Sequence, residues 1–254
     1  MTDRIALITG AAKRIGAAIA QDLARDGWHV IIHYHTSAAE AEGLAQTIAA
    51  DGGQCNTIQA DLSSREGIEG LIPRIVTAHG APSVLINNAS AFSNDVISTV
   101  TWESFHAQIT PNLAAPLFLS RDFARALTAA EGGCIINLLD QKVGNLNPDF
   151  LSYTLSKVAL QGLTTILAMA FGARIRVGGI APGITLISGQ QTEASFQRAW
   201  RSTPLGRSST PGDIAAAVRF ILDTPSFTGQ TITLDGGESL QGRARDVAFD
   251  LPRS

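Results

Sequence analysis

The sequence is poor in cysteine and has no long apolar run. Its two cysteines, Cys55 and Cys134, lie far apart and form no CxxC motif, so we expect free thiols in a reducing cytoplasm. The apolar runs are short and interrupted, so we expect no membrane span. Residues 4–10 already have the pattern of a strand, so we expect no signal peptide before them.

Charge is also sparse. Charged residues make up 16% of the chain, the formal net charge is -3 and no cluster of Lys and Arg forms a basic face, so a nucleic-acid partner is not expected. Hydrophobic residues make up 45% of 254 residues, which is enough material for one large core. Because no linker or low-complexity segment divides the sequence, we expect a single domain over residues 1–254.

Short apolar segments alternate with longer segments of helical periodicity. Seven such segments occur, at residues 4–10, 29–35, 54–62, 82–90, 133–140, 174–183 and 230–237. This α/β alternation predicts a Rossmann-type, doubly wound parallel sheet of about seven strands with helices on both faces. The polar segment at about 184–210, which contains Gly and Pro, is predicted to be a mobile flap over a site.

The loop "ITGAAKRIG", residues 8–16, joins the first predicted strand to the first predicted helix. Gly10 permits a tight turn, Gly16 permits close packing of helix on strand, and the helix N-terminus can bind an anion. We expect this loop to cradle a dinucleotide through Gly10, Lys13, Arg14, Ile15 and Gly16. Arg14 stands where many such loops have their middle glycine, so an ordinary strand-to-helix turn remains an alternative.

The end of the second predicted strand favours NADP(H) over NAD. A carboxylate at this place would hold the ribose 2′-hydroxyl of NAD, and none is present. The residues there are His33, Tyr34, His35, Thr36 and Ser37. With Lys13 and Arg14 nearby they suit a 2′-phosphate, although the histidines could be simply polar strand-end residues.

The chain resembles the short-chain dehydrogenase/reductases over nearly its full length. The matching pieces are "TGAAKRIG", "ADL" at 60–62, "NNAS" at 87–90, Asn112, "YTLSK" at 153–157, "IRVGGIAPG" at 175–183 and "FTGQTITLDGG" at 227–237. Within that family it is most similar to the pteridine reductases, including the dihydromonapterin reductases. That similarity is carried by Arg14, "HYHTSAAEAEGLA" after the second strand, "NNASAF" after the fourth, and Asp140 in place of the usual serine.

Tyr153 and Lys157 lie four residues apart, so on a helix they share a face. An ammonium group one turn away is expected to lower the pKa of the tyrosine and ease proton transfer. The resemblance implies that Lys157 also binds the nicotinamide ribose and that Asn112 joins the proton relay, in a helix kinked by Pro111 or Pro116. Without this context, a lone Y-x-x-x-K pair would more often be an ordinary helix surface.

The resemblance also implies further cofactor contacts and a homotetramer. The expected contacts with adenine, ribose, nicotinamide and diphosphate are Asp61, Leu62, Asn88, Ala89, Ser90, Pro182, Gly183 and Ile184. A turn pair at Asn87–Asn88 and a helix N-cap region at Asp61 are the structural alternatives. No metal ligand set is expected.

Substrate contacts are expected at Arg14, Ser90, Phe92, Asp140 and Tyr153. In pteridine reductases the aromatic residue that matches Phe92 stacks on the pterin, whereas a core phenylalanine is the alternative. A carboxylate at Asp140 suits a substrate nitrogen that must gain a proton, although it could simply cap a turn. Leu186, Phe196 and Trp200 of the flap could close the site or pack in the core.

These expectations combine into an NADPH-dependent reductase of a pterin, of the dihydropterin or dihydrofolate type. A general carbonyl reductase, acting on a ketone or 3-oxoacyl substrate, is the alternative if Asp140 is protonated. A non-catalytic NADP-binding sensor is an alternative of another class, disfavoured by the intact Asn112, Tyr153 and Lys157.

Overall fold

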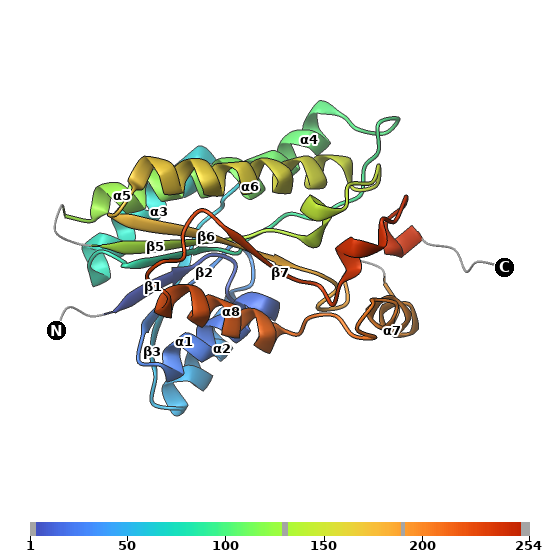
Figure 1. Ribbon diagram of the computed structural model, residues 1–254. Helices are drawn as coiled ribbons and strands as arrows, with labels where there is room; N and C mark the ends of the chain where they lie inside the picture. Colours follow the sequence, from blue (N-terminus) through green and yellow to red (C-terminus); the bar gives the residue numbers. More distant parts are fainter. Residues whose placement is uncertain (1–3, 129–131, 189–190, 250–254) are drawn as a thin grey trace.

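The computed structural model describes residues 4–128, 132–188 and 191–249. Its centre is a seven-stranded parallel sheet in the order β3-β2-β1-β4-β5-β6-β7, which confirms the predicted α/β class (Figure 1). The strands are β1 (Ile5–Ile8), β2 (His29–Tyr34), β3 (Gln54–Gln59), β4 (Val84–Asn87), β5 (Gly133–Leu138), β6 (Ile175–Pro182) and β7 (Thr231–Leu234).

The strand order reverses at β1, which pairs with β2 on one side and with β4 on the other. Ile8 lies opposite both Ile32 and Ile86, so the carboxyl ends of these three strands meet at one edge of the sheet. In an open parallel sheet, this reversal leaves a crevice at the carboxyl ends of the strands, where ligands bind. The topology therefore positions the predicted cradle at that crevice.

Helices cover both faces of the sheet (Figure 1). One core packs α1 (Arg14–Arg25), α2 (Ala38–Ala50) and α8 (Pro211–Asp223) against one face of the sheet. The other core packs α3 (Arg65–His79), α5 (Ala115–Ala126) and α6 (Leu151–Phe171) against the opposite face. Because strands such as β1 are buried on both faces, they read as continuous apolar runs in the sequence.

The long helix expected after residue 100 is interrupted. It consists of α4 (Trp102–Ile109), a π-helical turn η1 (Thr110–Ala114) and α5. Pro111 lies in the first turn of η1 and has no N–H to donate, so the regular helical hydrogen bonding is broken there. Asn112 therefore lies in the irregular turn, at the place where Pro111 was expected to kink the helix.

Helix α6 is long and apolar enough, by length and composition, to cross a membrane. In the structure it forms part of the second helical layer, and its buried residues include Tyr153 and Lys157. The two cysteines are free: Cys134 is buried and Cys55 is half-buried. Burial raises the pKa of the Cys134 thiol to about 11.

The predicted flap contains a helix, α7 (Glu193–Arg201), whose first turn is capped by the Thr192 side chain. Residues 189 and 190 of the flap lie outside the described residues, and the mobility of the flap stays a prediction. Three short 3-10 helices complete the described part of the fold. The helix η2 (Gln141–Gly144) precedes α6, and η3 (Glu238–Gln241) and η4 (Val247–Phe249) follow β7.

Candidate active site

The cradle loop lies so close to the end of β4 that two of its positions require glycine. A Cβ on Gly10, which has a φ of 61°, would lie 2.9 Å from the Cα of Ala89. A Cβ on Gly16 would lie 2.6 Å from the carbonyl oxygen of Gly10. The side chain of Asn88 donates to the carbonyls of Thr9 and Gly10, at 2.8 and 3.0 Å, and so holds the loop in this position. The loop is therefore packed tightly at the end of β4, and its binding of a diphosphate stays a prediction.

Arg14 occupies the position of the missing glycine in a backbone conformation typical of glycine. Its φ is 61°, in the left-handed region. Its guanidinium donates to the carbonyl oxygen of Ile187 at 2.7 Å and to the Ser188 hydroxyl at 3.3 Å. The side chain thus crosses from the cradle to the flap, over the carboxyl edge of the sheet. Lys13 lies at the surface, 3.5 Å from a carboxylate oxygen of Glu40.

His33 lies behind the cradle and does not face a 2′-phosphate. The Nδ1 of His33 accepts from the N–H of Gly10 at 3.0 Å, and its Nε2 lies 3.1 Å from the carbonyl oxygen of Ala60. The residue is only 2% exposed. Burial lowers its pKa to about 4, so the ring is neutral near pH 7. The expected phosphate contact of His33 is therefore corrected: its ring supports the backbone of the cradle at Gly10. His35, in contrast, is exposed, and its Nε2 lies 3.8 Å from a carboxylate oxygen of Asp61.

Other predicted cofactor residues lie along the same edge. Thr36 and Ser37 follow β2, Ser37 being the N-cap position of α2. Asp61 accepts from the N–H of Ser63 at 2.8 Å, just before α3, and the N-cap of that helix is Ser64. Gly183 packs tightly after β6, where a Cβ would lie 2.7 Å from the Cα of Asp235. Their cofactor roles stay predictions, as do those of the remaining residues, which are Ile15, Tyr34, Leu62, Ala89, Ser90, Pro182 and Ile184.

Asp140 contacts Tyr153 and also caps the turn that follows β5. The Tyr153 hydroxyl donates to Oδ2 of Asp140 at 2.9 Å, while Oδ1 accepts from the N–H of Lys142 at 2.9 Å. Asp140 is therefore a turn cap that also contacts Tyr153, and its role toward substrate stays a prediction. The capping bond fixes the carboxylate, and its second oxygen then fixes the tyrosine hydroxyl.

The pKa values of this cluster are perturbed by burial. Burial raises the pKa of Tyr153 well above its usual value, and the Asp140 carboxylate raises it further. This is opposite to the lowering expected from Lys157, because burial and the nearby carboxylate both favour the neutral phenol. Burial also raises the pKa of Asp140, although the bonds from Lys142 and Tyr153 act against it. The pKa of Lys157 is lowered to about 8 by burial, and its Nζ donates to the carbonyl oxygen of Leu138 at 2.8 Å.

Asn112 joins the loop after β4 to helix α6. Its side-chain oxygen accepts from the N–H of Ala91 at 2.8 Å and from the Ser90 hydroxyl at 3.1 Å. Its Nδ2 donates to the carbonyl oxygen of Ala91 at 2.9 Å and to the Ser156 hydroxyl at 3.1 Å. The π-helical turn thus holds Ser90 close to the helix that carries Tyr153 and Lys157.

Phe92 lies beside this cluster, and 46% of the residue is exposed. Its ring stacks on Phe150, with centroids 4.5 Å apart, and meets the Tyr153 ring edge-on at 4.7 Å. An aromatic ring that is half open to solvent is not a core residue, so the alternative interpretation of Phe92 is wrong. The structure therefore brings Phe92, Tyr153 and Asp140 together. The hydrogen bonds of the Arg14 side chain are with Ile187 and Ser188 of the flap, so its place in the substrate site stays a prediction.

A family model described as enoyl-(acyl carrier protein) reductase matches residues 10–239, which include the cradle, Asn112, Tyr153 and Lys157. The chain is a short-chain dehydrogenase/reductase. As a member of this family it is an oxidoreductase.

Three relatives in this family differ in what their names describe. The FolM alternative dihydrofolate reductase 1 of Brucella suis, solved with NADP, is 38% identical with a TM-score of 0.86, covering 93% of this chain and 95% of its own. Pteridine reductase 1 of Leishmania tarentolae is 32% identical, with 94% of this chain and 97% of that protein covered. The 3-oxoacyl-[acyl-carrier-protein] reductase FabG of Pseudomonas aeruginosa is also 32% identical, with 92% and 96% covered.

Sequence reasoning missed two residues of this reductase site. Phe150 stacks on Phe92 and has a left-handed backbone with a φ of 53°, which no turn motif in the sequence indicates. Glu238 is 3% exposed, and its Oε1 accepts from the side chain of Gln141 at 3.3 Å. Burial raises the pKa of Glu238 to about 7, helped by the nearby carboxyl groups of Asp140 and Asp246. Both residues come from segments that sequence periodicity could not position.

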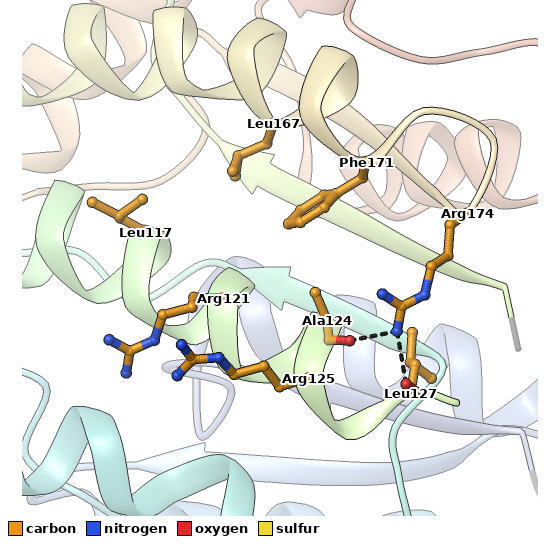
Figure 2. A pocket seen from close by; sticks show the side chains of 8 residues that line it. All are labelled: Leu117, Arg121, Ala124, Arg125, Leu127, Leu167, Phe171 and Arg174. Carbon is orange, nitrogen blue, oxygen red and sulfur yellow. Dashed lines mark hydrogen bonds between the residues drawn. The ribbon is translucent and has the colours of Figure 1, made fainter. Parts of the chain in front are cut away.

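A separate hollow of about 520 Å³ lies between α5 and α6 (Figure 2). Arg174 closes one end of it by donating to the carbonyl oxygens of Ala124 and Leu127, at 2.6 and 2.7 Å. Its wall on α6 includes Leu167, which lies about 20 Å along the helix from Tyr153 at 1.5 Å per residue. This hollow is therefore distinct from the candidate active site. Within the described ranges, no group of three or more His, Cys, Asp or Glu could hold a metal ion.

Proposed function

We propose that this short-chain reductase uses NADPH to reduce a pterin of the dihydropterin or dihydrofolate type. The observation that carries the proposal is the Tyr153–Asp140 hydrogen bond beside the half-exposed ring of Phe92. This arrangement pairs a surface for a flat heteroaromatic ring with a group that can protonate a ring nitrogen. The FolM and pteridine reductase relatives support the same substrate class.

The residues present fit an NADP cofactor. The tight loop of Gly10 and Gly16 leads into the N-terminus of α1, whose N–H groups suit a diphosphate. Lys13 and His35, both exposed, provide groups for a 2′-phosphate where no acidic side chain ends β2. NADPH, when bound, supplies the hydride for a carbon of a C=N bond. Lys157, with Asn88, Ala89 and Ser90, would hold its ribose and nicotinamide.

Tyr153 is the proposed proton donor. Its pKa lies well above its usual value because of burial and the Asp140 carboxylate, so the phenol carries a proton across the physiological pH range. Reduction of a C=N bond requires that proton at the adjacent nitrogen. Asp140 positions the donor and can accept from the N–H or amino groups of the pterin. Lys157 remains the ammonium of the cluster, since it is cationic below a pKa of about 8.

Phe92, Ser90 and Arg14 are proposed to bind the substrate ring. One face of Phe92 is covered by Phe150, and 46% of the residue is exposed, so the proposal places a stacked pterin on the exposed part of the ring. The Ser90 hydroxyl lies at the same loop, 3.1 Å from the side-chain oxygen of Asn112. Arg14, whose guanidinium carries several donors, would meet the polar edge of the ring.

A general carbonyl reductase is a second candidate, favoured by one specific observation. Burial raises the pKa of Asp140, and a protonated carboxyl group could polarise a carbonyl oxygen as a serine hydroxyl does. The FabG relatives act on 3-oxoacyl substrates, as their name states. A non-catalytic NADP-binding sensor is disfavoured, because Asn112, Tyr153 and Lys157 are all present and well connected.

The deciding experiment follows NADPH oxidation with the purified protein. Dihydrobiopterin and dihydrofolate form one substrate panel, and simple ketones with a 3-oxoacyl thioester form the other. Turnover of a pterin above the blank supports the proposal. Turnover of the carbonyl panel alone supports the second candidate, and tight NADPH binding without any turnover supports the sensor.

A homo-oligomer, expected to be a tetramer, is part of the proposal. Helices α5 and α6 expose the apolar side chains of Phe118, Ile166 and Met169. Exposed apolar side chains on neighbouring helices favour association between copies of the chain. Light scattering coupled to size exclusion would measure the mass, and a monomer at micromolar concentration would contradict this part.

A further inference from the structure

The chain from the end of η3 to η4 lies beside helix α7 (Figure 1). We call residues 241–249 the C-terminal strap; it is drawn in red beside α7 in Figure 1. At its start, the Gln241 side chain donates to the carbonyl oxygen of Ser202 at 2.7 Å. Arg243 donates to the Ser202 hydroxyl at 2.8 Å. These bonds attach the strap to the end of the flap helix α7.

The far half of the strap is held by ion pairs with the buried side chains of Asp149 and Lys142. Arg245 binds the Asp149 carboxylate through two nitrogens, at 2.7 and 2.8 Å, and the N–H of Asp246 donates to the same carboxylate at 2.8 Å. The carboxylate of Asp246 in turn pairs with Lys142. The Lys142–Asp246 pair is shielded from water, since these side chains are 4% and 13% exposed. The Arg245–Asp149 pair is shielded on one side only, because Asp149 is 1% exposed and Arg245 is 55% exposed. A two-point Arg–carboxylate pair also fixes orientation, which a single surface ion pair does not.

A row of three rings runs from the strap to the substrate surface. Phe249 stacks on Phe150, with centroids 5.7 Å apart and planes inclined by 28°. Phe150 stacks on Phe92 at 4.5 Å and 15°, and Phe92 meets Tyr153 edge-on. Phe150 also has a left-handed backbone, which is unfavourable for a residue with a side chain. Its ring contacts on the two sides therefore help to hold it in an otherwise disfavoured position.

We propose that the C-terminal strap is a substrate-positioning element: Phe249, held by the Arg245–Asp149 pair, fixes Phe150 and thereby fixes the Phe92 ring. The inference rests on the proposed function for the role of Phe92 as the substrate surface. It goes beyond that function because it assigns a role to a segment outside the proposed substrate-binding and cofactor-binding residues. A flat ring benefits from a fixed stacking partner, so the strap favours planar heteroaromatic substrates over flexible acyl chains.

The inference predicts that loss of Phe249 raises the KM for the substrate, and that this effect depends on the presence of the Phe92 ring. Phe249→Ala should raise KM for the pterin about three- to tenfold, the effect of one aromatic contact, with kcat and NADPH affinity within about twofold. In a Phe92→Ala background the same change should add less than about twofold, because the ring it supports is gone. Asp149→Asn, which keeps the shape but removes the charge, should raise KM in the same direction.

Leu240→Ala is the matched control, since Leu240 lies just before the strap and is 83% exposed. It should leave KM unchanged. If Phe249→Ala does not fold, Phe249→Leu replaces it in the same cycle. Equal effects of the Phe249 change with and without Phe92, or no effect at all, would overturn the inference. If the wild-type protein reduces only ketones, the proposed function fails; the same double-mutant cycle with a ketone then tests the coupling of Phe249 to Phe92 by itself.

Discussion

The Tyr153 hydroxyl donates a hydrogen bond to the Asp140 carboxylate across 2.9 Å, where a short-chain reductase commonly has a serine. The two groups are coupled, because the carboxylate raises the pKa of the phenol and the phenol lowers that of the carboxyl. Substrate choice should therefore change when the charge at Asp140 is removed.

Asp140→Asn is expected to lower kcat/KM for the pterin about a hundredfold, because a positioned acid or base contributes about 10²- to 10⁴-fold. Asp140→Ser should shift the ratio of ketone to pterin turnover toward ketones. Steady-state kinetics on both substrate panels measures this, with Asp51→Asn, an exposed aspartate after α2, as the control. Full pterin turnover by Asp140→Asn would contradict the role assigned to the charge.

Tyr153→Phe keeps the ring that meets Phe92 and removes the hydroxyl. We expect kcat to fall at least about a hundredfold, since the proposed proton donor is lost. NADPH affinity, followed by fluorescence titration, should change by less than about threefold. A variant that retains most of its activity would show that another group delivers the proton.

Arg14→Gly and Arg14→Ala separate backbone strain from side-chain contacts. Both variants lose the bonds to Ile187 and Ser188, so both should raise the substrate KM. Only glycine accepts a φ of 61° without strain. The free energy of unfolding of the Gly variant should therefore be about 1 kcal/mol higher than that of the Ala variant. Urea denaturation measures the difference. Equal stabilities would mean that the backbone relaxes at this position.

The pH dependence of activity should report Lys157. Burial lowers its pKa to about 8, and the lysine is cationic below that value. Activity that requires the ammonium group should therefore fall as the pH rises through about 8. A profile of kcat/KM between about pH 6 and pH 10 tests this. A flat profile over that range would contradict it.

Glu238 should make stability depend on pH. Its pKa is about 7 in the folded protein, above the value of about 4.3 for an unfolded glutamate. The folded state holds this proton more strongly, so the stabilisation is present below the unfolded value and is lost as the pH rises through about 7. Glu238→Gln cannot ionise at this position. Its free energy of unfolding relative to that of the wild type should therefore increase by about 1–3 kcal/mol as the pH rises from about 5 to about 8. Urea unfolding at the two pH values measures this, and an unchanged difference would contradict it.

The strands, the cradle and the Tyr153–Lys157 pair could be predicted because each depends on local sequence. Strand burial produces continuous apolar runs, and one helical turn brings residues 153 and 157 together. The alternation of strands and helices predicts a parallel sheet with right-handed crossovers, whereas the order of its strands was not predicted and is given by the structure. Even the glycine-like backbone of Arg14 agrees with its place in the glycine pattern.

The remaining features depend on contacts between distant segments. His33 reads as a strand-end residue, and only the packing of Gly10 and Ala60 shows that both ring nitrogens are occupied inside the fold. The direction of the pKa shift at Tyr153 depends on burial, which the spacing to Lys157 does not indicate. The left-handed backbone of Phe150 and the buried side chain of Glu238 have no sequence signal of their own.

The row of Phe92, Phe150 and Phe249 joins segments that are far apart along the chain. Contacts of such long range form late in folding, because the loop between them must close first. The strap contributes no strand to the sheet, so its opening would leave the two helical layers intact. Amide hydrogen exchange should accordingly find the backbone of residues 241–249 opening as a unit of its own, well before the global unfolding of the sheet.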